Sequence, residues 1–402
     1  MKKHFWSTAG AALLCASMLA GCSNTSSSTT SGAASTGDST AASAAPAGDT
    51  VKIGLNFELT GNVADYGTKE LNGAKIAVDM FNAREDKPFT VETVEFDNIG
   101  QPAESVAGIT KLIEQDKVVG VVGPATSASS IATYDFASSK QVPVISPSVT
   151  QVDAMMNNGT PYEYAWRVCF EDSYQGKAMA DYAVNELGAK KAVILNEVSD
   201  YGIGLADAFT EELDKLGGEV LDRSEYQSGD KDFASFITKI KDLDFDVIYI
   251  AGYYNEAAQI IKTAQADGID KPIIGADGLD SADLISQIGA ANANNIYYTT
   301  AYTAIDASDD LKAFIEAYKA EYGEDPSMFA ALSYDATNML LSALESSGKT
   351  GAELNEAIKN VDFSGVTGSF SFDEATHTPK KSVLVVELVD GVQSNVKEVE
   401  AE

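Results

Sequence analysis

The sequence predicts an α/β protein with two doubly wound lobes, each a parallel sheet that helices cover on both faces. From residue 51 onward, short apolar runs alternate with segments whose apolar residues recur at helical spacing. Nearly continuous apolar strands between helices are typical of parallel sheets that are buried on both faces. The alternation forms two series on either side of the stretch WRVCFEDSYQG at 166–176, and a chain of 402 residues has room for two such lobes.

The first series predicts the first lobe. In the helix expected at 66–83, the apolar residues Leu71, Ala74, Val78 and Phe81 recur at the spacing of one helix face. The other elements expected in this series are strands at 51–57, 89–96, 117–123 and 142–146 and helices at 102–114 and 127–139.

The second series predicts the second lobe. The helix expected at 231–241 carries Phe233, Phe236, Ile237 and Ile240 at positions i, i+3, i+4 and i+7, which is the stripe of a core-facing helix. The other expected elements are helices at 174–187, 204–216 and 255–267 and strands at 191–196, 218–226, 245–252 and 271–277. Beyond residue 300 we expect a helix from Ser308 that stops at Gly323 and Pro326, a helix at 329–345, and closing strands near 366–372 and 383–389.

Residues 1–21 have the features of a secretory signal. Lys2 and Lys3 precede a mostly apolar run at 9–20, which is too short for a membrane span of about 20 residues. The sequence LAGC at the end of this run resembles the lipobox of bacterial lipoproteins, in which the cysteine is diacylated on sulfur and the signal is cut just before it. Lipidation of Cys22 is therefore expected; the alternative is a simple cleavable signal with an incidental cysteine.

The segment at 22–50 is expected to be a tether. After Cys22 it consists almost entirely of Ser, Thr, Ala and Gly, and it cannot bury enough apolar surface to offset the entropy of ordering. A flexible chain of this length has a root-mean-square reach of ~30 Å. We therefore expect an extracytoplasmic protein, at the cell surface or in the periplasm, anchored to the membrane by the lipid on Cys22.

The charge balance and the scarcity of histidine and cysteine argue against several functions. With 60 acidic and 28 basic residues, nucleic acid and anionic lipid surfaces are poor partners. Beyond the lipidated Cys22, a processed chain would keep only His377 and Cys169, too few for a zinc site or an internal disulfide. His377 lies in the polar stretch DEATHTPKKS without a nucleophile motif, which indicates a surface-loop histidine and not a Ser-His-Asp triad. We expect no catalysis, no cofactor and no metal.

Hydroxyl groups cluster where two expected strands end. In VVGPATSASS, Thr126 and Ser127 lie between the carboxyl end of a strand and the amino end of a helix. Unpaired backbone N–H groups and the helix dipole favour an anion at such a position. The next strand ends in ISPSVTQ, which places Ser148 and Thr150 beside the first turn. Together the turns predict a carboxylate site, with the alternative that Ser127 is only a helix N-cap.

Tyrosines and one acid follow other strands of the predicted sheets. Tyr66, Tyr201 and Tyr253 each come after a strand, and aromatic walls with a few polar groups are typical of small-molecule pockets. Asp277 ends the strand KPIIGAD and could bind a cation; the alternative is a turn aspartate before Gly278. In sheets of this kind, ligands bind at the carboxyl ends of the strands, so all these residues are expected to line one cleft.

The combination of LTGNVADYGTKELNGAKIAVDMFNA, VVGPATSASS, VPVISPSVT, VSDYGIGLADAF, GYYNEAAQIIKTA and GADGLDS resembles the branched-chain amino-acid binding proteins of bacterial ATP-driven (ABC) importers. The resemblance covers nearly all of 51–395. It implies a type I periplasmic-binding-protein clamshell whose two lobes are joined by three crossovers, the first lobe at 51–171 and 301–368, the second at 172–300 and 369–402. It also implies a monomer that binds a small amino acid and delivers it to the membrane permease subunits of an importer.

The resemblance also assigns roles to single positions. It implies that Ser127 and Thr150 take the α-carboxylate of the ligand and that Asp277 takes its α-ammonium group. Further ligand contacts are implied for backbone groups of Ala125, Thr126, Ser148 and Val149 and for the rings of Tyr66, Tyr201, Tyr253 and Phe329.

Two departures from the family leave the ligand open. Asp277 stands where some members have a longer glutamate, and Leu279 stands where many have tryptophan. Leucine, isoleucine or valine therefore does not follow from the resemblance alone. The alternative is a binding protein or sensor for another small solute, such as an amide, a short peptide, an aromatic acid or a purine.

Overall fold

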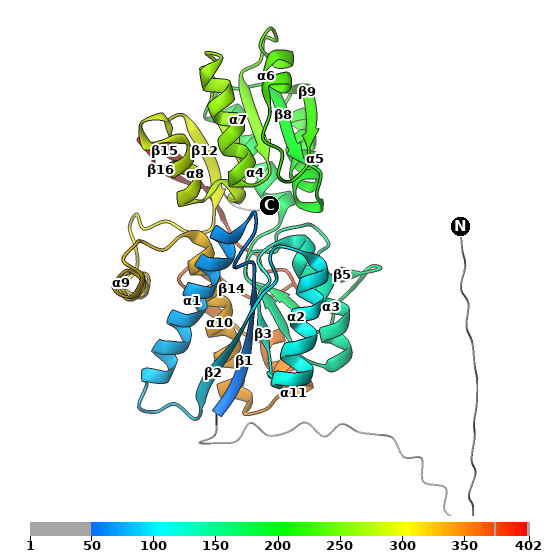
Figure 1. The fold of residues 1–402 in the computed structure, drawn as a ribbon, viewed down its shortest axis with the longest axis vertical. Coiled ribbons are helices and arrows are strands. Elements are labelled where there is room, and N and C mark those ends of the chain that lie inside the picture. Colours follow the sequence, from blue (N-terminus) through cyan, green and yellow to red (C-terminus); the bar gives the residue numbers. More distant parts are fainter. Residues whose placement is uncertain (1–49, 374, 400–402) are drawn as a thin grey trace, which may run out of the picture. The chain divides into compact units, whose positions relative to one another are not determined.

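The computed structural model describes residues 50–373 and 375–399 (Figure 1). The expected signal, Cys22 and all of the expected tether except Thr50 lie outside these residues. Thr50 itself is the first residue of a strand. No helix in the described part of the chain is both long and apolar enough to span a membrane.

The first lobe is built on a five-stranded parallel sheet with the order β2-β1-β3-β4-β7. Its strands are β1 (Thr50–Phe57), β2 (Thr90–Asp97), β3 (Val121–Val122), β4 (Val144–Ser146) and β7 (Ala165–Arg167). Its helices are α1 (Ala64–Ala83), α2 (Pro102–Lys111) with a π-helical continuation (Leu112–Asp116), α3 (Ser127–Lys140), α10 (Met328–Ser347) and α11 (Ala352–Lys359). Apolar residues of α1 and α10 pack on one face of the sheet and those of α2 and α3 on the other.

Helices α1 and α10 cross in close contact, and a glycine makes this possible. A Cβ atom on Gly73 would lie 2.0 Å from the carbonyl oxygen of Ala330. Any side chain at this position would therefore push the helices apart. Their contact matters for the site, because the ends of these helices that lie nearest the second lobe (Figure 1) are their first turns, which contain Tyr66 on α1 and Phe329 on α10.

The second lobe is built on a seven-stranded sheet with the order β16-β15-β12-β11-β10-β8-β9. Its strands are β8 (Lys191–Glu197), β9 (Glu219–Tyr226), β10 (Val247–Ala251), β11 (Ile273–Gly275), β12 (Ile296–Thr300), β15 (Val383–Val389) and β16 (Val392–Val399). Helices α4 (Asp172–Asn185) and α5 (Asp200–Lys215) cover one face, and α6 (Ala234–Ile240), α7 (Tyr254–Ala266) and α8 (Ala282–Ile288) cover the other. The last two strands are antiparallel, so this sheet is mixed and not wholly parallel.

The chain passes between the two sheets three times. It leaves β7 for α4, returns after β12 through α9 (Asp309–Tyr322) to α10, and leaves again between β14 (Gly368–Phe370) and β15. The remaining elements are β5 (Met156–Asn157), β6 (Thr160–Pro161), β13 (Phe363–Gly365) and the 3-10 turns Asp277–Leu279 and Ala290–Asn292. The predicted two-lobed α/β architecture is confirmed by this topology.

A buried network ties the first and third passages together. Lys381 Nζ donates to the carbonyl of Val168 at 3.0 Å and to Thr367 Oγ1 at 2.7 Å. Thr367 Oγ1 in turn donates to Asp335 Oδ2 at 2.5 Å. Because each buried polar group has a partner, the passages are held together without an unpaired charge.

Several predicted elements differ from the structure. Strands β7, β12 and β16 were not predicted, and the strand expected near 366–372 is shorter than predicted: it is β14, which pairs with the unpredicted β13 in a hairpin. The carboxylate of Asp335 accepts the backbone N–H groups of Val366 and Thr367, which fixes a turn at the start of that stretch. The expectation of a surface-loop His377 is wrong, because its buried ring stacks on Trp166 with centroids 4.1 Å apart.

Candidate functional site

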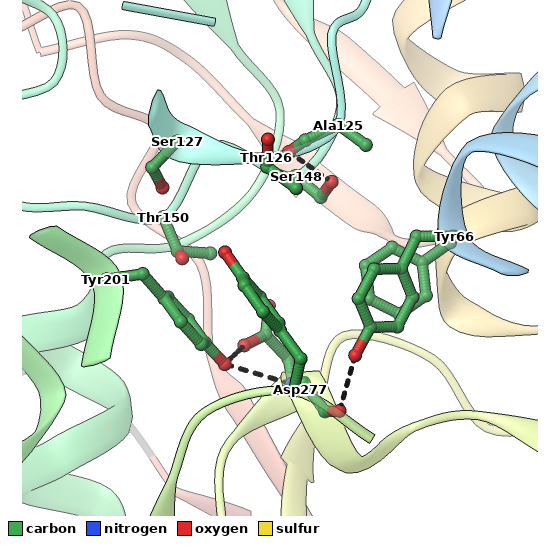
Figure 2. Close-up of a pocket in the computed structure, with 11 residues that line it drawn as sticks. Tyr66, Ala125, Thr126, Ser127, Ser148, Thr150, Tyr201 and Asp277 are labelled. Atoms are coloured by element: carbon green, nitrogen blue, oxygen red, sulfur yellow. Dashed lines mark hydrogen bonds between the residues drawn. The ribbon is translucent and has the colours of Figure 1, made fainter. Parts of the chain in front are cut away.

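One cavity between the two lobes collects nearly all the residues that the sequence singled out (Figure 2). Its space is about 270 Å³, counting the part that is open to solvent. It is lined by Tyr66, Ala125, Thr126, Ser127, Ser148, Thr150, Tyr201, Tyr253, Asp277, Gly278 and Phe329. The first lobe contributes Tyr66, Ala125, Thr126, Ser127, Ser148, Thr150 and Phe329, and the second contributes Tyr201, Tyr253, Asp277 and Gly278.

The amino end of α3 forms one side of the cavity. The first intrahelical bond runs from Ser130 N–H to Thr126 C=O, so the N–H groups of residues 127–129 have no acceptor within the helix. Thr126 is the N-cap residue by position, and its side chain makes no capping hydrogen bond. Ser127 is the first helical residue and therefore does not cap the helix, which removes the structural alternative considered for it.

The resemblance implied ligand contacts from the backbone at 125 and 126, but the N–H groups of these residues already donate to an acceptor within the protein. Glu58 Oε2 accepts the N–H of Ala125 at 3.0 Å, and its Oε1 accepts the N–H of Thr126 at 3.0 Å and the Thr126 hydroxyl at 2.9 Å. These donors therefore face a carboxylate of the protein itself. The anion-binding capacity of this turn begins one residue later, at Ser127.

Hydroxyl groups complete this side of the cavity. Ser127 Oγ accepts the backbone N–H of Gln151 at 3.3 Å, which leaves the Ser127 hydroxyl proton available. The Ser127 and Thr150 side chains lie close to one another in Figure 2. Both are almost fully buried in this closed arrangement. A carboxylate placed here would meet hydroxyl donors and the positive end of the helix dipole.

Asp277 forms the opposite side, beneath these hydroxyls in Figure 2. Its Oδ1 accepts the Tyr201 hydroxyl at 2.7 Å and Gln175 Nε2 at 3.1 Å. Burial raises the pKa of Asp277 to about 6, although the bonds from Tyr201 and Gln175 lower it. An ammonium group beside this carboxyl would favour its ionised form and bind to it.

A second buried acid lies behind Asp277. Asp172, at the start of α4, accepts Gln175 Nε2 at 3.2 Å, so one amide group bridges the two carboxyls. Burial and the neighbouring charge of Asp277 raise the pKa of Asp172 well above its usual value. Sequence reasoning missed both Asp172 and Gln175, although both lie in the WRVCFEDSYQG stretch.

Aromatic rings form the wall between the two polar sides. The rings of Tyr201 and Tyr253 stack in parallel with centroids 4.9 Å apart. Tyr66 packs on Phe329 at 4.3 Å and edge-on to Tyr253 at 5.7 Å, so the wall continues across both lobes. Such a wall suits an apolar side chain of a small ligand.

Three further positions can be placed. Val149 does not line the cavity: its side chain is in the core beside α3, and its carbonyl accepts Arg167 Nη1 at 3.1 Å. Leu279 is buried in the core of the second lobe and is also absent from the cavity lining. Gly278 was not predicted to line the cavity; a Cβ there would lie 2.5 Å from the carbonyl of Gly252 and 2.8 Å from Tyr201 Oη.

Comparison with known sequences identifies the family. Residues 50–393 match the family described as periplasmic binding protein. The chain belongs to the periplasmic binding protein family. Similar proteins include the Leu/Ile/Val-binding protein BraC3 of Rhizobium johnstonii, 31% identical over 80% of this chain and 89% of that protein. Another is the leucine-, isoleucine-, valine-, threonine- and alanine-binding protein of Pseudomonas aeruginosa, 28% identical over 81% of this chain and 86% of that protein.

Solved structures of other family members agree. The branched-chain amino acid transporter substrate-binding protein LivJ of Streptococcus pneumoniae, solved in complex with isoleucine, has a TM-score of 0.83 and 39% identity over 87% of this chain and 99% of its own. The leucine-binding protein LivK of Thermotoga maritima has a TM-score of 0.80 and 33% identity over 86% of this chain and 98% of its own. The resemblance to branched-chain amino-acid binding proteins and the type I periplasmic-binding-protein fold are therefore confirmed.

Proposed function

We propose that this protein is a non-catalytic, extracytoplasmic solute-binding lipoprotein that captures a branched-chain or similar hydrophobic amino acid and delivers it to the permease of an ABC importer. The observation that carries the proposal is the opposition of two kinds of group across one cavity. Ser127, at the amino end of α3, and Thr150, in the turn after β4, face Asp277 with an aromatic wall between them. This arrangement fits a zwitterion with an apolar side chain.

The two ends of the ligand would be held by different lobes. Ser127 and Thr150 belong to the first lobe, whereas Asp277 and Tyr201 belong to the second. A ligand that contacts both lobes binds the closed arrangement more tightly than an open one, and it shifts the population toward closure. The three passages between the lobes would act as the hinge.

The anchor and the partner are supported by the sequence and by the relatives. The lipobox-like LAGC and the Ser/Thr-rich segment that follows support a lipid anchor at Cys22. The similar Streptococcus pneumoniae protein is described as a transporter substrate-binding protein. Delivery to a permease would then use a closed, ligand-loaded protein that stays tethered near the membrane.

Ligand binding can be tested with isothermal titration calorimetry on the purified protein lacking residues 1–49, which lie outside the described fold. We expect leucine, isoleucine or valine to bind. Leucinamide, which lacks the carboxylate, and isocaproate, which lacks the ammonium group, should each bind far more weakly. Equal affinity for all three leucine-type compounds would contradict the zwitterion proposal. A thermal-shift screen over the twenty amino acids, purines and short amides would then identify another solute.

A further inference from the structure

Two buried carboxyls lie behind the hydroxyl side of the cavity, and neither contacts the cavity directly. Glu58 follows β1, and Glu70 lies on α1; both side chains are fully buried. Glu58 bonds to the turn at 125–126, and Glu70 bonds to Ser148. The same residue, Ala125, is therefore held from both sides, because Ser148 Oγ also lies 2.9 Å from the Ala125 carbonyl oxygen.

The hydrogen-bond partners of Glu58 fit an ionised carboxylate. The N–H of Ala125, the N–H of Thr126 and the Thr126 hydroxyl all donate to its two oxygens. A carboxylate only accepts, so it satisfies all three donors. The amino end of α3 adds the positive end of its dipole. Burial still raises the pKa of Glu58 above its usual value, while these donors lower it.

The partners of Glu70 instead fit the protonated acid. Ser148 has a single hydroxyl proton, but its oxygen is within hydrogen-bond distance of both Glu70 Oε1 and the Ala125 carbonyl, which only accepts. If Glu70 were ionised, one of these two acceptors would lack a proton. If Glu70 is protonated, it donates to Ser148 Oγ and Ser148 donates to the Ala125 carbonyl, so both contacts of the Ser148 hydroxyl are hydrogen bonds with one proton each. Among the described residues, Glu70 Oε2 has no hydrogen-bond partner, which a buried ionised carboxylate would not tolerate well.

We propose that Glu70 is a protonated positioning residue that, together with ionised Glu58, fixes the turn at 125–127 for a ligand carboxylate, and that ionisation of Glu70 weakens ligand binding. This inference rests on the proposed function. Ionised Glu70 would draw the Ser148 proton away from Ala125. It would also add a second negative charge beside Glu58, directly behind the place where the ligand carboxylate binds.

The charges around Glu70 support this assignment. Burial is the main cause that raises its pKa well above the usual value, and the charge of Glu58 raises it further, while the bond from Ser148 lowers it. Lys69 on the same helix pairs with Glu324, and Asp335 on the packed helix α10 bonds to the turn at 366–367. Because the ligand favours protonated Glu70, its affinity should fall as the pH rises through the Glu70 pKa, by at most about tenfold per pH unit.

The binding test measures isoleucine affinity by calorimetry from neutral to mildly alkaline pH, below the range in which the ligand's own ammonium group loses its proton. The wild type should lose affinity toward alkaline pH. Glu70→Leu has no donor for Ser148, so it should bind several-fold more weakly at neutral pH. Glu70→Gln offers an amide donor to Ser148 that does not titrate, so it should restore binding relative to Glu70→Leu and remove the alkaline loss. Glu104→Gln, the same change at an exposed site on α2, should keep the wild-type pH profile. An alkaline loss that persists in Glu70→Gln would overturn the proposal.

A second measurement tests the protonation state without any ligand. Infrared spectra of the wild type and of Glu70→Gln at neutral pH should differ by the carbonyl band of one protonated carboxylic acid. Taking the difference removes the bands of other buried acids. If the spectra show no such band, Glu70 is ionised and the proposal is wrong, whatever the protein binds. If the band is present but no amino acid binds to the wild type, the proposed function fails while the protonated Glu70 stands.

Discussion

Tyr66 of the first lobe donates its hydroxyl to the backbone carbonyl of Gly278 in the second lobe at 2.6 Å. The hydroxyl oxygen of Tyr66 also accepts the backbone N–H of Tyr254 at 3.2 Å. Both bonds are buried and both join the lobes, and Figure 2 shows the bond from Tyr66 to the Gly278 carbonyl as a dashed line. Because Gly278 directly follows Asp277, Tyr66 connects closure of the lobes to the segment that would bind the ligand's ammonium group.

The change Tyr66→Phe should therefore weaken ligand binding by disfavouring the closed arrangement. The ring would keep its packing on Phe329, and only the cross-lobe hydrogen bonds would be lost. A net loss of about 1 kcal/mol per hydrogen bond corresponds to a roughly fivefold rise in Kd for one bond and about thirtyfold for both. We expect most of it to appear as faster dissociation in stopped-flow measurements. Tyr334→Phe, which removes a hydroxyl bonded to Met80 within the first lobe, is the matched control and should leave Kd and the dissociation rate unaltered.

The change Asp277→Asn should abolish amino-acid binding and stabilise the ligand-free protein. The folded-state pKa of Asp277 is about 6, above its usual 3.8, because of burial. The folded state thus holds the proton more tightly than the unfolded state, and stability is lost as the pH rises from about 3.8 through about 6. Asparagine removes this loss, which is on the order of 3 kcal/mol at neutral pH.

Denaturant unfolding of the ligand-free protein at neutral pH checks this prediction. Asp277→Asn should raise the midpoint, and the gain should shrink at acidic pH where wild-type Asp277 is protonated. Asp214→Asn, at an exposed position on α5, should change stability by no more than about 0.5 kcal/mol. A lower midpoint for Asp277→Asn would show that its carboxylate stabilises the empty protein.

Most of the fold followed from local periodicity. The stripe Phe233, Phe236, Ile237 and Ile240 is buried as predicted, and the strand expected at 383–389 has those bounds in the structure. Periodicity failed where an element is very short, as in the three residues of β7. It also failed where a distant side chain decides the backbone path, as when the carboxylate of Asp335 turns the chain between β13 and β14.

The site was predictable to the extent that its residues follow strand ends. The turn at 126–127 and Asp277 can both be recognised in the sequence, because each comes shortly after an apolar strand. Glu58 also follows a strand, β1, but it contacts the turn from 67 residues away, and nothing local indicates that it occupies the amides of Ala125 and Thr126. The protonation of Glu70 is likewise a property of the folded arrangement, since it depends on which acceptors share the Ser148 hydroxyl.

The change Ser127→Ala should weaken the binding of free amino acids selectively. It removes a hydroxyl donor from the carboxylate side but leaves the N–H groups of α3 in place. The loss of a hydrogen bond to a charged group is worth about 1.5–3 kcal/mol, which corresponds to a roughly tenfold to hundredfold rise in Kd. Calorimetry with leucine and leucinamide separates the two contributions. An equal loss for the amide would show that Ser127 acts on closure or folding and not on the carboxylate.

The affinity for leucine should fall below a pH of about 6, because protonated Asp277 no longer attracts an ammonium group. The ligand's own carboxyl stays ionised well below that pH, so the loss reports on the protein. Tyr201→Phe tests the assignment. The Tyr201 hydroxyl donates to Asp277 Oδ1 at 2.7 Å and lowers the pKa of Asp277, so its removal should raise that pKa. The ring would still stack on Tyr253. The midpoint of the acid loss should therefore move to higher pH in this variant, and a midpoint that stays in place would assign the titration to another group.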